Sequence, residues 1–265
     1  MGVHCVTVRP LPRWAPAERL LGPGFTELGE GAWEARLPAA AAADVATRLR
    51  GLGLAGEALS VEVRPRLPRP LVREARAEDA RRRRDTTPGF TRPGARLDAE
   101  GRWSLTPEVL ALAMGRLAAG RQVVDAGCGA GGNAIGFARA GSPVTAVELD
   151  PARLELARHN ARLYGVADRI HFLLGDAQQL DLSGDILFLD PPWGVDYDRA
   201  LTPLSALPLF AALRGLPFRA LWLKAPPSLD TRALPSAEIS PIFGRAPGDL
   251  RRIKFLLLRI PGSVT

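Results

Sequence analysis

Residues 121–141 read RQVVDAGCGAGGNAIGFARAG, an apolar run followed by a cluster of glycines and a second apolar run. The first run predicts a strand at 121–127, and the second predicts a helix at 132–140. The glycines between them lie at a strand-to-helix turn, where the lack of a side chain lets the backbone bend tightly and approach a bound molecule. Such a unit is typical of α/β folds built around a parallel sheet.

The chain downstream of this unit continues to alternate apolar strands with helical segments. Strands are expected at 143–149, 169–175, 185–190 and 219–225, and helices at 151–164 and near 203–214. Two last strands, near 237–243 and 252–260, are joined by residues 244–251 without a helix. This alternation predicts a parallel sheet covered by helices on both faces, to which the final hairpin adds an antiparallel strand. We therefore predict an α/β fold with a seven-stranded, mostly parallel, Rossmann-like sheet in residues 97–265.

Residues 1–96 differ from the rest in composition, with many Arg, Pro and Gly and only short apolar runs. The expected elements are a strand at 3–8, a helix at 15–21, a hairpin around 29–31, a helix at 39–50 and a strand at 59–63. The order β-α-β-β-α-β is that of the ferredoxin-like arrangement, which RNA-binding modules, enzymes and regulators share. We predict a small N-terminal α+β domain of this kind, ending in a basic linker helix at about 71–96.

Four consecutive arginines, Arg81, Arg82, Arg83 and Arg84, lie in the linker helix. On a helix, successive residues point about 100° apart, so these side chains surround the axis instead of lining one face. They fit a solvated helix and a phosphate-binding arm equally well, and in the second case they would contact the substrate. The next helix is expected to start near Thr106 as N-cap, with Pro107 at the first helical position.

The chain has 265 residues and a formal net charge of +7, and Lys224 and Lys254 are its only lysines. Guanidinium groups bind phosphates bidentately, so the charge suits a nucleic-acid partner, although a GC-rich genome or adaptation to heat gives the same composition. No apolar run reaches about 18 residues, and the first residues, MGVHCVTVRPLP, lack the apolar region of a secretory signal. With two cysteines and no disulfide framework, a cytoplasmic protein without a membrane span is expected.

The residues beside the glycine loop indicate which molecule binds there. Gly127 and Gly129 belong to two patterns. Gly132 completes the G-x-G-x-x-G of dinucleotide-binding proteins, and Gly131 completes the G-x-G-x-G of methyltransferases. Asp125 favours the second pattern, because a carboxylate suits a cationic amino-acid group and would repel a pyrophosphate. The loop is therefore predicted to bind S-adenosylmethionine, with NAD as the alternative.

Acidic residues also follow the next two strands. Glu148 ends the second strand, where an acidic side chain accepts hydrogen bonds from both ribose hydroxyls of a nucleotide. Asp150 is expected to be the N-cap of the helix at 151–164. Asp176 follows the third strand and would receive the adenine amino group beside the backbone of Ala177, with a simple turn residue as the alternative.

Residues 190–193, Asp-Pro-Pro-Trp, directly follow the fourth strand and face the same cleft as the glycine loop. An exocyclic base amine is a poor nucleophile, because its lone pair is delocalised into the ring. Two acceptors, Asp190 and the carbonyl of Pro191, would grip both N–H groups and aim that lone pair at a methyl donor. Proline fixes φ and so keeps the carbonyl aimed, and Trp193 offers a face for base stacking. We predict catalytic roles for Asp190, Pro191, Pro192 and Trp193.

At these residues the chain resembles the trimethylguanosine synthase family, the RNA cap guanine-N2 methyltransferases. The similar blocks are LDAEGRWSLTPE (97–108), GAGGNAIGFARAG (129–141), ELDPARLELARHNARLYGV (148–166) and PPWGVDY (191–197). The resemblance implies the Rossmann-like methyltransferase fold, with its terminal hairpin, and S-adenosylmethionine as cofactor. It also implies cofactor contacts at Asp125, Gly127, Glu148 and Asp176, and it places Ser104 and Thr106 beside cofactor and substrate. The full predicted cofactor set is Thr106, Asp125, Gly127, Gly129, Gly131, Asn133, Glu148, Asp176 and Ala177.

The expected target is guanine N2 in a structured RNA, such as rRNA, tRNA or a cap-like end. Asp190 stands where cap enzymes usually have Ser, and it resembles the wider group of amino-methyltransferases acting on DNA, ribosomal RNA and tRNA. Adenine N6 or DNA is therefore the alternative within the same fold. The expected substrate contacts are Trp193, Ser104, Lys224 as a phosphate ligand, and Arg81, Arg82, Arg83 and Arg84.

Two readings from other functional classes stay open. The glycine loop permits an NAD-dependent oxidoreductase, and the basic small domain permits an RNA-binding protein without catalysis. No His/Cys cluster suggests a metal site, and no obligate protein partner is evident.

Overall fold

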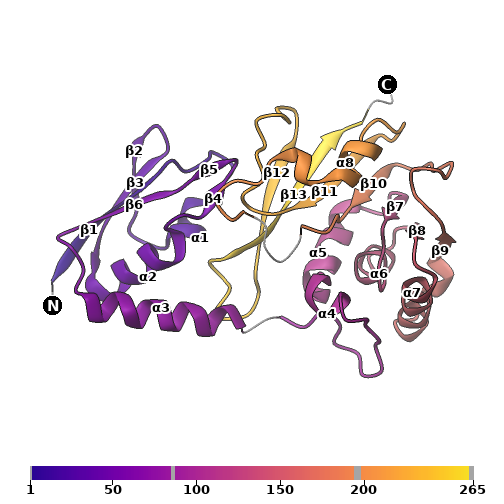
Figure 1. The fold of residues 1–265 in the computed structure, drawn as a ribbon, viewed down its shortest axis with the longest axis horizontal. Helices are drawn as coiled ribbons and strands as arrows, with labels where there is room; N and C mark the ends of the chain where they lie inside the picture. Colours follow the sequence, from indigo (N-terminus) through magenta and orange to yellow (C-terminus); the bar gives the residue numbers. More distant parts are fainter. Residues whose placement is uncertain (1, 85–86, 194–197, 263–265) are drawn as a thin grey trace.

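The structure describes residues 2–84, 87–193 and 198–262, and of residues 83, 84 and 103 only the backbone. It is a computed structural model in which a small and a large sheet lie side by side along the long axis (Figure 1). Among the helices of the described residues, none is long and apolar enough to cross a membrane.

The small sheet is built from the first quarter of the chain. Its strands are β1 (Val3–Arg9), β2 (Thr26–Gly29), β3 (Ala32–Pro38) and β6 (Ser60–Arg64), and its helices are α1 (Ala17–Leu21) and α2 (Ala39–Leu49). The strand order β2-β3-β1-β6, with β1 antiparallel to both neighbours, is that of a ferredoxin-like sheet. Val6 and Val8 of β1 are fully buried and share an apolar cluster with Val45 and Leu49 of α2. The ferredoxin-like prediction is therefore confirmed.

Helix α3 (Arg69–Arg84) follows the small sheet and packs against α2. It is shorter than the predicted linker helix, because residues 87–96 are not helical. Pro88 and Pro93 lie in that stretch, and proline lacks the N–H that a helix interior requires. Short elements that the sequence did not predict are β4 (Gly53–Leu54), β5 (Glu57–Ala58) and α4 (Gly101–Ser104).

The large sheet has the strand order β12-β13-β11-β10-β7-β8-β9. Its strands are β7 (Val123–Ala126), β8 (Val144–Glu148), β9 (Ile170–Leu174), β10 (Ile186–Leu189), β11 (Ala220–Ala225), β12 (Glu238–Phe243) and β13 (Ile253–Pro261). Strands β7 to β11 pair in parallel, whereas β13 is antiparallel to β11 and β12. The Rossmann-like methyltransferase sheet with its terminal hairpin is thus confirmed.

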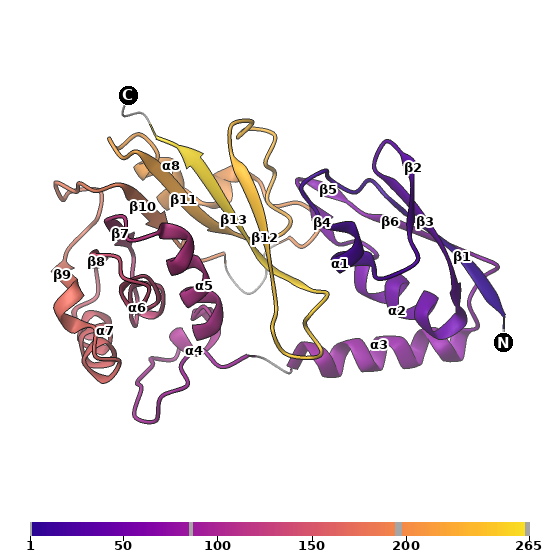
Figure 2. The same cartoon turned by 180° about the vertical axis from the view of Figure 1, so that it is seen from behind.

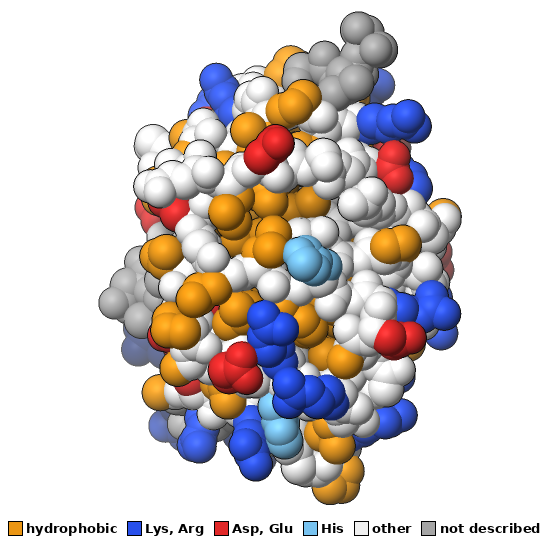
Figure 3. All heavy atoms as spheres, turned by 90° about the vertical axis from the view of Figure 1, so that its right-hand side faces the viewer, with side chains coloured by type: hydrophobic (Ala, Val, Ile, Leu, Met, Phe, Trp, Pro, Cys, Tyr) orange, Lys and Arg blue, Asp and Glu red, His pale blue; other side chains and the backbone are white. Residues whose placement is uncertain are grey.

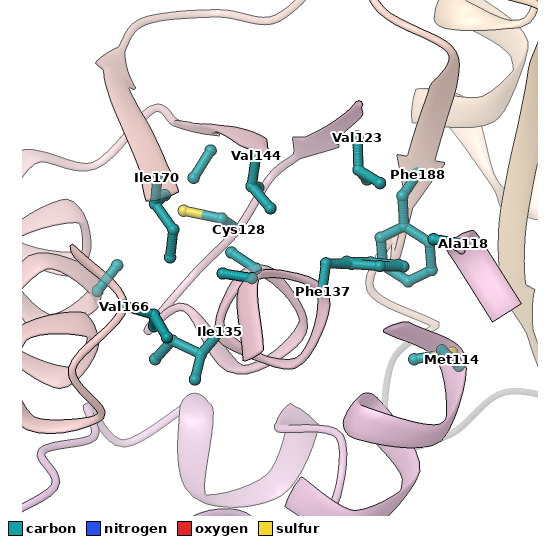
Figure 4. Close-up of a cluster of buried hydrophobic side chains, with 14 of the residues drawn as sticks. Met114, Ala118, Val123, Cys128, Ile135, Phe137, Val144, Val166, Ile170 and Phe188 are labelled. Carbon is teal, nitrogen blue, oxygen red and sulfur yellow. The ribbon is translucent and has the colours of Figure 1, made fainter. Parts of the chain in front are cut away.

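Both faces of the large sheet are covered. The helical elements around it are α5 (Glu108–Ala118), α6 (Gly132–Arg139), α7 (Pro151–Leu163), η1 (Ala167–Arg169), η2 (Leu204–Ala206) and α8 (Pro208–Leu213). On one face Phe188 packs against Phe137 of α6, with ring centroids 5.1 Å apart in an edge-to-face arrangement (Figure 4). On the other face Leu187 shares a cluster with Phe210 of α8. Because alternate residues of a strand point to opposite faces, burial on both faces explains why the central strands are apolar throughout.

The terminal hairpin of the large sheet also packs against the small sheet. Phe243, at the end of β12, is buried in the same apolar cluster as Val6 and Leu49. Arg252, just before β13, forms an ion pair with Asp79 of α3. Figure 2 shows β12 and β13 between the small sheet and the rest of the large one.

A second contact joins the two-stranded β4–β5 pair, which precedes β6, to the segment that follows residues 190–193. The N–H of Gly53 in β4 donates a hydrogen bond to the carbonyl oxygen of Arg199 at 2.8 Å. A β carbon on Gly53 would lie 2.0 Å from the carbonyl oxygen of Ala200, so the approach requires glycine. The β4–β5 pair therefore holds a segment that starts only a few residues after Trp193.

Helices α5 and α6 also approach closely, and this contact gives a stability prediction. A β carbon on Gly136 would lie 2.6 Å from the carbonyl carbon of Ala111. Alanine favours a helix over glycine by about 1 kcal/mol, but overpacking costs roughly 1–3 kcal/mol, so we expect Gly136→Ala to lower the free energy of unfolding. Urea unfolding would measure the difference. Gly215→Ala, where no heavy atom lies within 4 Å, is the control and should leave stability unchanged; equal stabilities of the two variants would contradict the close contact.

Candidate active site

The parallel pairing of β7, β8 and β10 brings three acidic side chains to one edge of the large sheet. Asp125 lies in β7, Glu148 ends β8 and Asp190 directly follows β10. They are close enough that the charges of Asp190 and Glu148 both act on Asp125. The edge is therefore an acidic site formed by the ends of three strands.

The glycine loop, residues 127–132, connects β7 to α6 at this edge. Gly129 and Gly131 have φ values of 54° and 90°, in the left-handed region that side chains disfavour. A β carbon on Gly131 would also lie 3.1 Å from Cα of Ala157 in α7. A side chain would therefore be strained by the backbone conformation at both positions, and at Gly131 it would also press against α7.

The Glu148 carboxylate supports this loop. Its Oε2 accepts a hydrogen bond from the N–H of Gly129 at 2.8 Å, and its Oε1 accepts from the N–H groups of Leu149 and Asp150, each at 3.0 Å. An ionised carboxylate accepts about four hydrogen bonds in all. With three in use, Glu148 retains capacity for about one more, fewer than the two ribose contacts that the sequence predicted.

Two further acidic residues lie at the neighbouring strand ends. Asp150 accepts from the N–H of Ala152 at 2.7 Å and is the N-cap of α7, as predicted. Asp176 accepts from the N–H of Gln178 at 2.9 Å, which is a turn contact, and Ala177 beside it is buried. Asp176 therefore forms the turn contact that was the alternative to cofactor binding. Its Oδ2 accepts no hydrogen bond from a described residue.

Asp190 is anchored through a single oxygen. Its Oδ2 accepts hydrogen bonds from Lys224 Nζ at 2.8 Å, Asn133 Nδ2 at 2.9 Å and Thr106 Oγ1 at 3.4 Å. Among the described residues none donates to Oδ1. The carboxylate is thus fixed in orientation while one oxygen keeps its acceptor capacity.

The position of Lys224 contradicts its prediction as a phosphate ligand. Its residue is 5% exposed, and the ammonium forms an ion pair with Asp190 at 2.8 Å. The ammonium also lies 5.3 Å from the ring centroid of Trp193, which is half-buried. A buried cation that is already paired has no access to a phosphate, so Lys224 instead fixes Asp190 and packs against Trp193.

Asp125 is fully buried, and neither of its carboxylate oxygens has a hydrogen bond among the described residues. Burial, followed by the negative charge of Asp190, raises the pKa of Asp125 to about 8, although the nearby backbone N–H of Ala134 and the charge of Lys224 act in the opposite direction. Asp125 is therefore protonated at neutral pH until a cation approaches it.

The structure changes the roles of three other predicted residues. Thr106 is not the N-cap of α5, since Pro107 takes that position and the Thr106 hydroxyl instead donates to Asp190. Asn133, predicted at the cofactor, likewise donates to Asp190. Ser104 is exposed, and its hydroxyl donates to the backbone oxygen of Glu100 within α4, so no feature of the structure directs it at a substrate.

The arginine run is partly neutralised. Arg81 forms an ion pair with Glu78, and Arg82 forms ion pairs with Glu78 and Asp44. The side chains of Arg83 and Arg84 lie outside the described residues, as do residues 194–197 of the block that resembles the cap methyltransferases. For the two arginines that the structure describes fully, these ion pairs favour the solvated helix over the predicted phosphate-binding arm.

Comparison with known proteins shows what this part of the chain resembles. The model of the RNA cap guanine-N2 methyltransferase family matches residues 120–202, which include Asp125, Glu148 and Asp190. The matched residues include β7, β8, β9 and β10 of the large sheet. The resemblance noted from the sequence is therefore confirmed, and together with the sheet order it indicates S-adenosylmethionine as the cofactor.

Individual relatives cover limited parts of the chain. The trimethylguanosine synthase of Schizosaccharomyces pombe is 34% identical over 113 residues, 38% of this chain and 47% of that protein. An uncharacterized RNA methyltransferase of Gloeobacter violaceus is 35% identical over 133 residues, 48% of this chain and 27% of that protein. The chain thus spans less than half the length of these curated relatives. A solved RNA methyltransferase from Salinibacter ruber, in complex with S-adenosyl-L-homocysteine, is 22% identical, with a TM-score of 0.41 over 60% of this chain and 95% of that one.

The side chains at the sheet edge fit the charge of S-adenosylmethionine. Its amino-acid part carries an ammonium group, and the buried Asp125 lacks a hydrogen-bond partner that such a group supplies. Glu148 retains acceptor capacity for a hydroxyl, and the glycine loop admits close approach of a ligand. Within the described residues, no group of three or more His, Cys, Asp or Glu side chains is placed to hold a metal ion.

The raised pKa of Asp125 predicts proton release on ligand binding. A free protein with a pKa of about 8 at Asp125 carries about 0.9 proton there at pH 7, and an adjacent ammonium lowers that pKa and displaces the proton. Titration calorimetry of S-adenosylhomocysteine at pH 7, in buffers of different ionisation enthalpy, should show release of close to one proton. The Asp125→Asn variant is the control and should release none. If the binding heat of the unaltered protein did not depend on the buffer, no proton would be released, and Asp125 would not be the group that binds the ammonium.

The Lys224–Asp190 pair predicts strong energetic coupling. Removing one partner of a buried ion pair leaves an uncompensated charge, which costs about 3–5 kcal/mol, so Lys224→Met should destabilise the protein by that order. With Asp190→Asn as the second variant, the double variant should be less destabilised than the sum of the single ones, by about 0.5–3 kcal/mol. A double-mutant cycle measured by urea unfolding tests this. Additive effects would mean that the two groups do not interact.

Proposed function

We propose that this protein transfers a methyl group from S-adenosylmethionine to the exocyclic N2 amine of guanine in a structured RNA. The observation that carries the proposal is the anchoring of Asp190 through Oδ2 alone, which leaves Oδ1 for a substrate amine. The family match supports RNA as the substrate and guanine N2 as the acceptor.

The chemical difficulty lies in the nucleophile. The amine of guanine is conjugated with the ring, so its lone pair becomes available only when both N–H bonds are held in a suitable orientation. Asp190 Oδ1 accepts one N–H, and the carbonyl of Pro191 is the proposed acceptor of the other. Since Thr106, Asn133 and Lys224 fix Oδ2, the free oxygen needs no reorientation when the base binds.

Trp193 is the proposed stacking surface for the base. It is half-buried between the two apolar clusters of the large sheet, which limits its motion. Lys224 lies against its ring, and the same lysine pairs with Asp190. Lys224 therefore contacts both the proposed hydrogen-bond acceptor, Asp190, and the proposed stacking surface, Trp193. The bound cofactor would supply the methyl group. The amine nitrogen that receives the methyl group loses a proton, and Asp190 is the proposed acceptor of that proton.

The first test is methylation of RNA by the purified protein with isotopically labelled S-adenosylmethionine. The readout is mass spectrometry of nucleosides, and the expected product is N2-methylguanosine. Removing one preorganised polar group from an active site typically lowers kcat by about 10²–10³, so Asp190→Ala should lower methyl transfer by at least that factor. Asp181→Ala, an exposed aspartate between β9 and β10, is the matched control and should retain full activity.

Two outcomes would overturn parts of the proposal. Labelled N6-methyladenosine, or transfer to DNA but not to RNA, would move the substrate to the alternative within the same fold. Unchanged transfer by Asp190→Ala would remove Asp190 from the chemistry altogether.

A further inference from the structure

A cavity of about 740 Å³ lies between α2, β6 and α3. Its floor is apolar, with Ala43, Ala46 and Val63 among its lining residues. Its rim is basic, and the arginines that line it are Arg50, Arg66, Arg69, Arg73 and Arg76. We call this cavity the arginine groove.

The arginines of the groove have no acidic partners among the described residues. Arg50 donates one hydrogen bond to the backbone oxygen of Val61 at 3.2 Å, and all five side chains belong to exposed residues. Asp79 is the single acidic residue of the lining, and it forms an ion pair with Arg252. Five positive charges therefore face the groove with no matching negative charge.

Three of the arginines that line the groove lie on α3, and their spacing in the sequence brings them together. Arg69, Arg73 and Arg76 are spaced i, i+4 and i+7, which places them on one face of the helix. Like charges at this spacing destabilise a helix, whereas Arg81 and Arg82 on the same helix are paired with acids. A bound polyanion would reduce the repulsion between these arginines.

We propose that the arginine groove binds the phosphodiester backbone of the RNA substrate. This inference rests on the proposed function, which supplies RNA as the polyanion. Planar guanidinium groups match phosphate oxygens bidentately, and several of them along one helix face match the repeating charge of a strand. An acidic peptide also carries repeated charge, and the test below distinguishes it.

The position of the groove suits a substrate that extends away from the reacting base. Helix α3 is about 24 Å long at 1.5 Å per residue, and its last turns are held to the terminal hairpin through Asp79 and Arg252. Figures 1 and 2 show α3 running along the small sheet toward α4 and α5. The groove would thus hold phosphates several nucleotides from the target, while the Gly53–Arg199 contact ties the same module to the segment after Trp193.

The opposite end of the molecule is less suited to this role. Figure 3 shows that face, where β9 and α7 lie, with Lys and Arg side chains interspersed among acidic and apolar ones. The cavity there is lined by Arg158 and Arg162, and Arg158 is paired with Glu155 at 3.2 Å. Of these two cavities, the arginine groove therefore has the greater concentration of arginines without acidic partners.

The test compares two triple variants that lose the same charge. Arg69→Gln, Arg73→Gln and Arg76→Gln are combined in the groove variant, and Arg116→Gln, Arg169→Gln and Arg214→Gln are combined in the control variant. Fluorescence anisotropy measures binding of a labelled single-stranded RNA of about 20 nucleotides over a range of salt concentrations. Binding of S-adenosylhomocysteine and the thermal midpoint show that each variant is folded.

We expect the groove variant to bind this RNA roughly 10–100-fold more weakly at low salt, and its slope of log K against log salt to be shallower by about 2, since each single-strand phosphate contact contributes about 0.7. The control variant should keep the wild-type slope. Equal losses in both variants would overturn the proposal, because they would reflect net charge alone. It would also be overturned if the groove variant lost affinity for single-stranded DNA or for poly-glutamate but kept its affinity for RNA.

The two proposals fail separately. If the groove variant loses RNA binding while Asp190→Ala leaves methyl transfer unchanged, the arginine groove stands and the assignment of the active site falls. If Asp190→Ala abolishes transfer while the groove variant binds RNA with wild-type affinity and salt slope, the active site stands and the groove is excluded.

Discussion

Burial of negative charge at one edge of the large sheet is the constraint on which the candidate active site depends. Parallel strands end at the same edge, so Asp125, Glu148 and Asp190 are necessarily close, and a buried carboxylate is costly unless it is compensated. Glu148 is compensated by three backbone N–H groups, and Asp190 by Lys224. Neither oxygen of Asp125 has a hydrogen bond among the described residues, and its raised pKa keeps it neutral at pH 7. The site is therefore prepared for one additional positive charge, and that charge fits the ammonium group of the proposed cofactor.

Compensation of Asp190 also sets its geometry. Thr106 precedes α5, Asn133 lies in the first turn of α6 and Lys224 lies in β11, so donors from three separate parts of the chain converge on one oxygen. An acceptor that is held from one side and open on the other suits a substrate amine that must be gripped without moving the protein. Because the same lysine contacts Trp193, packing of β11 in the sheet controls both the acceptor and the proposed stacking surface.

The sequence predicted the fold because its signals are local. Strands that are apolar on both faces, the glycine loop and the Asp150 cap each follow from a few neighbouring residues. The ion pair between Asp190 and Lys224 could not be predicted from neighbouring residues. Leu189 pairs with Leu223, so the next residues, Asp190 and Lys224, lie side by side only once β10 and β11 are known to be neighbours in register. Nothing local to ALWLKA separates a buried, paired lysine from a solvated one. For the same reason the sequence could suggest that Asn133 and Thr106 lie near the ligands but could not direct them at Asp190.

The arginines show how periodicity outweighs local density of charge. The run of Arg81 to Arg84 attracts attention because its charges are consecutive, but a helix spreads consecutive residues around its axis, and the acids Glu78 and Asp44 reach the two that are described. Arg69, Arg73 and Arg76 are not consecutive in the sequence, yet the helix gathers them on one face, where none of them forms an ion pair with a described acid. Cooperative contact with a polyanion depends on charges that share a face and are not already neutralised. A helical stripe of unpaired arginines meets both conditions, and a cluster in sequence alone meets neither.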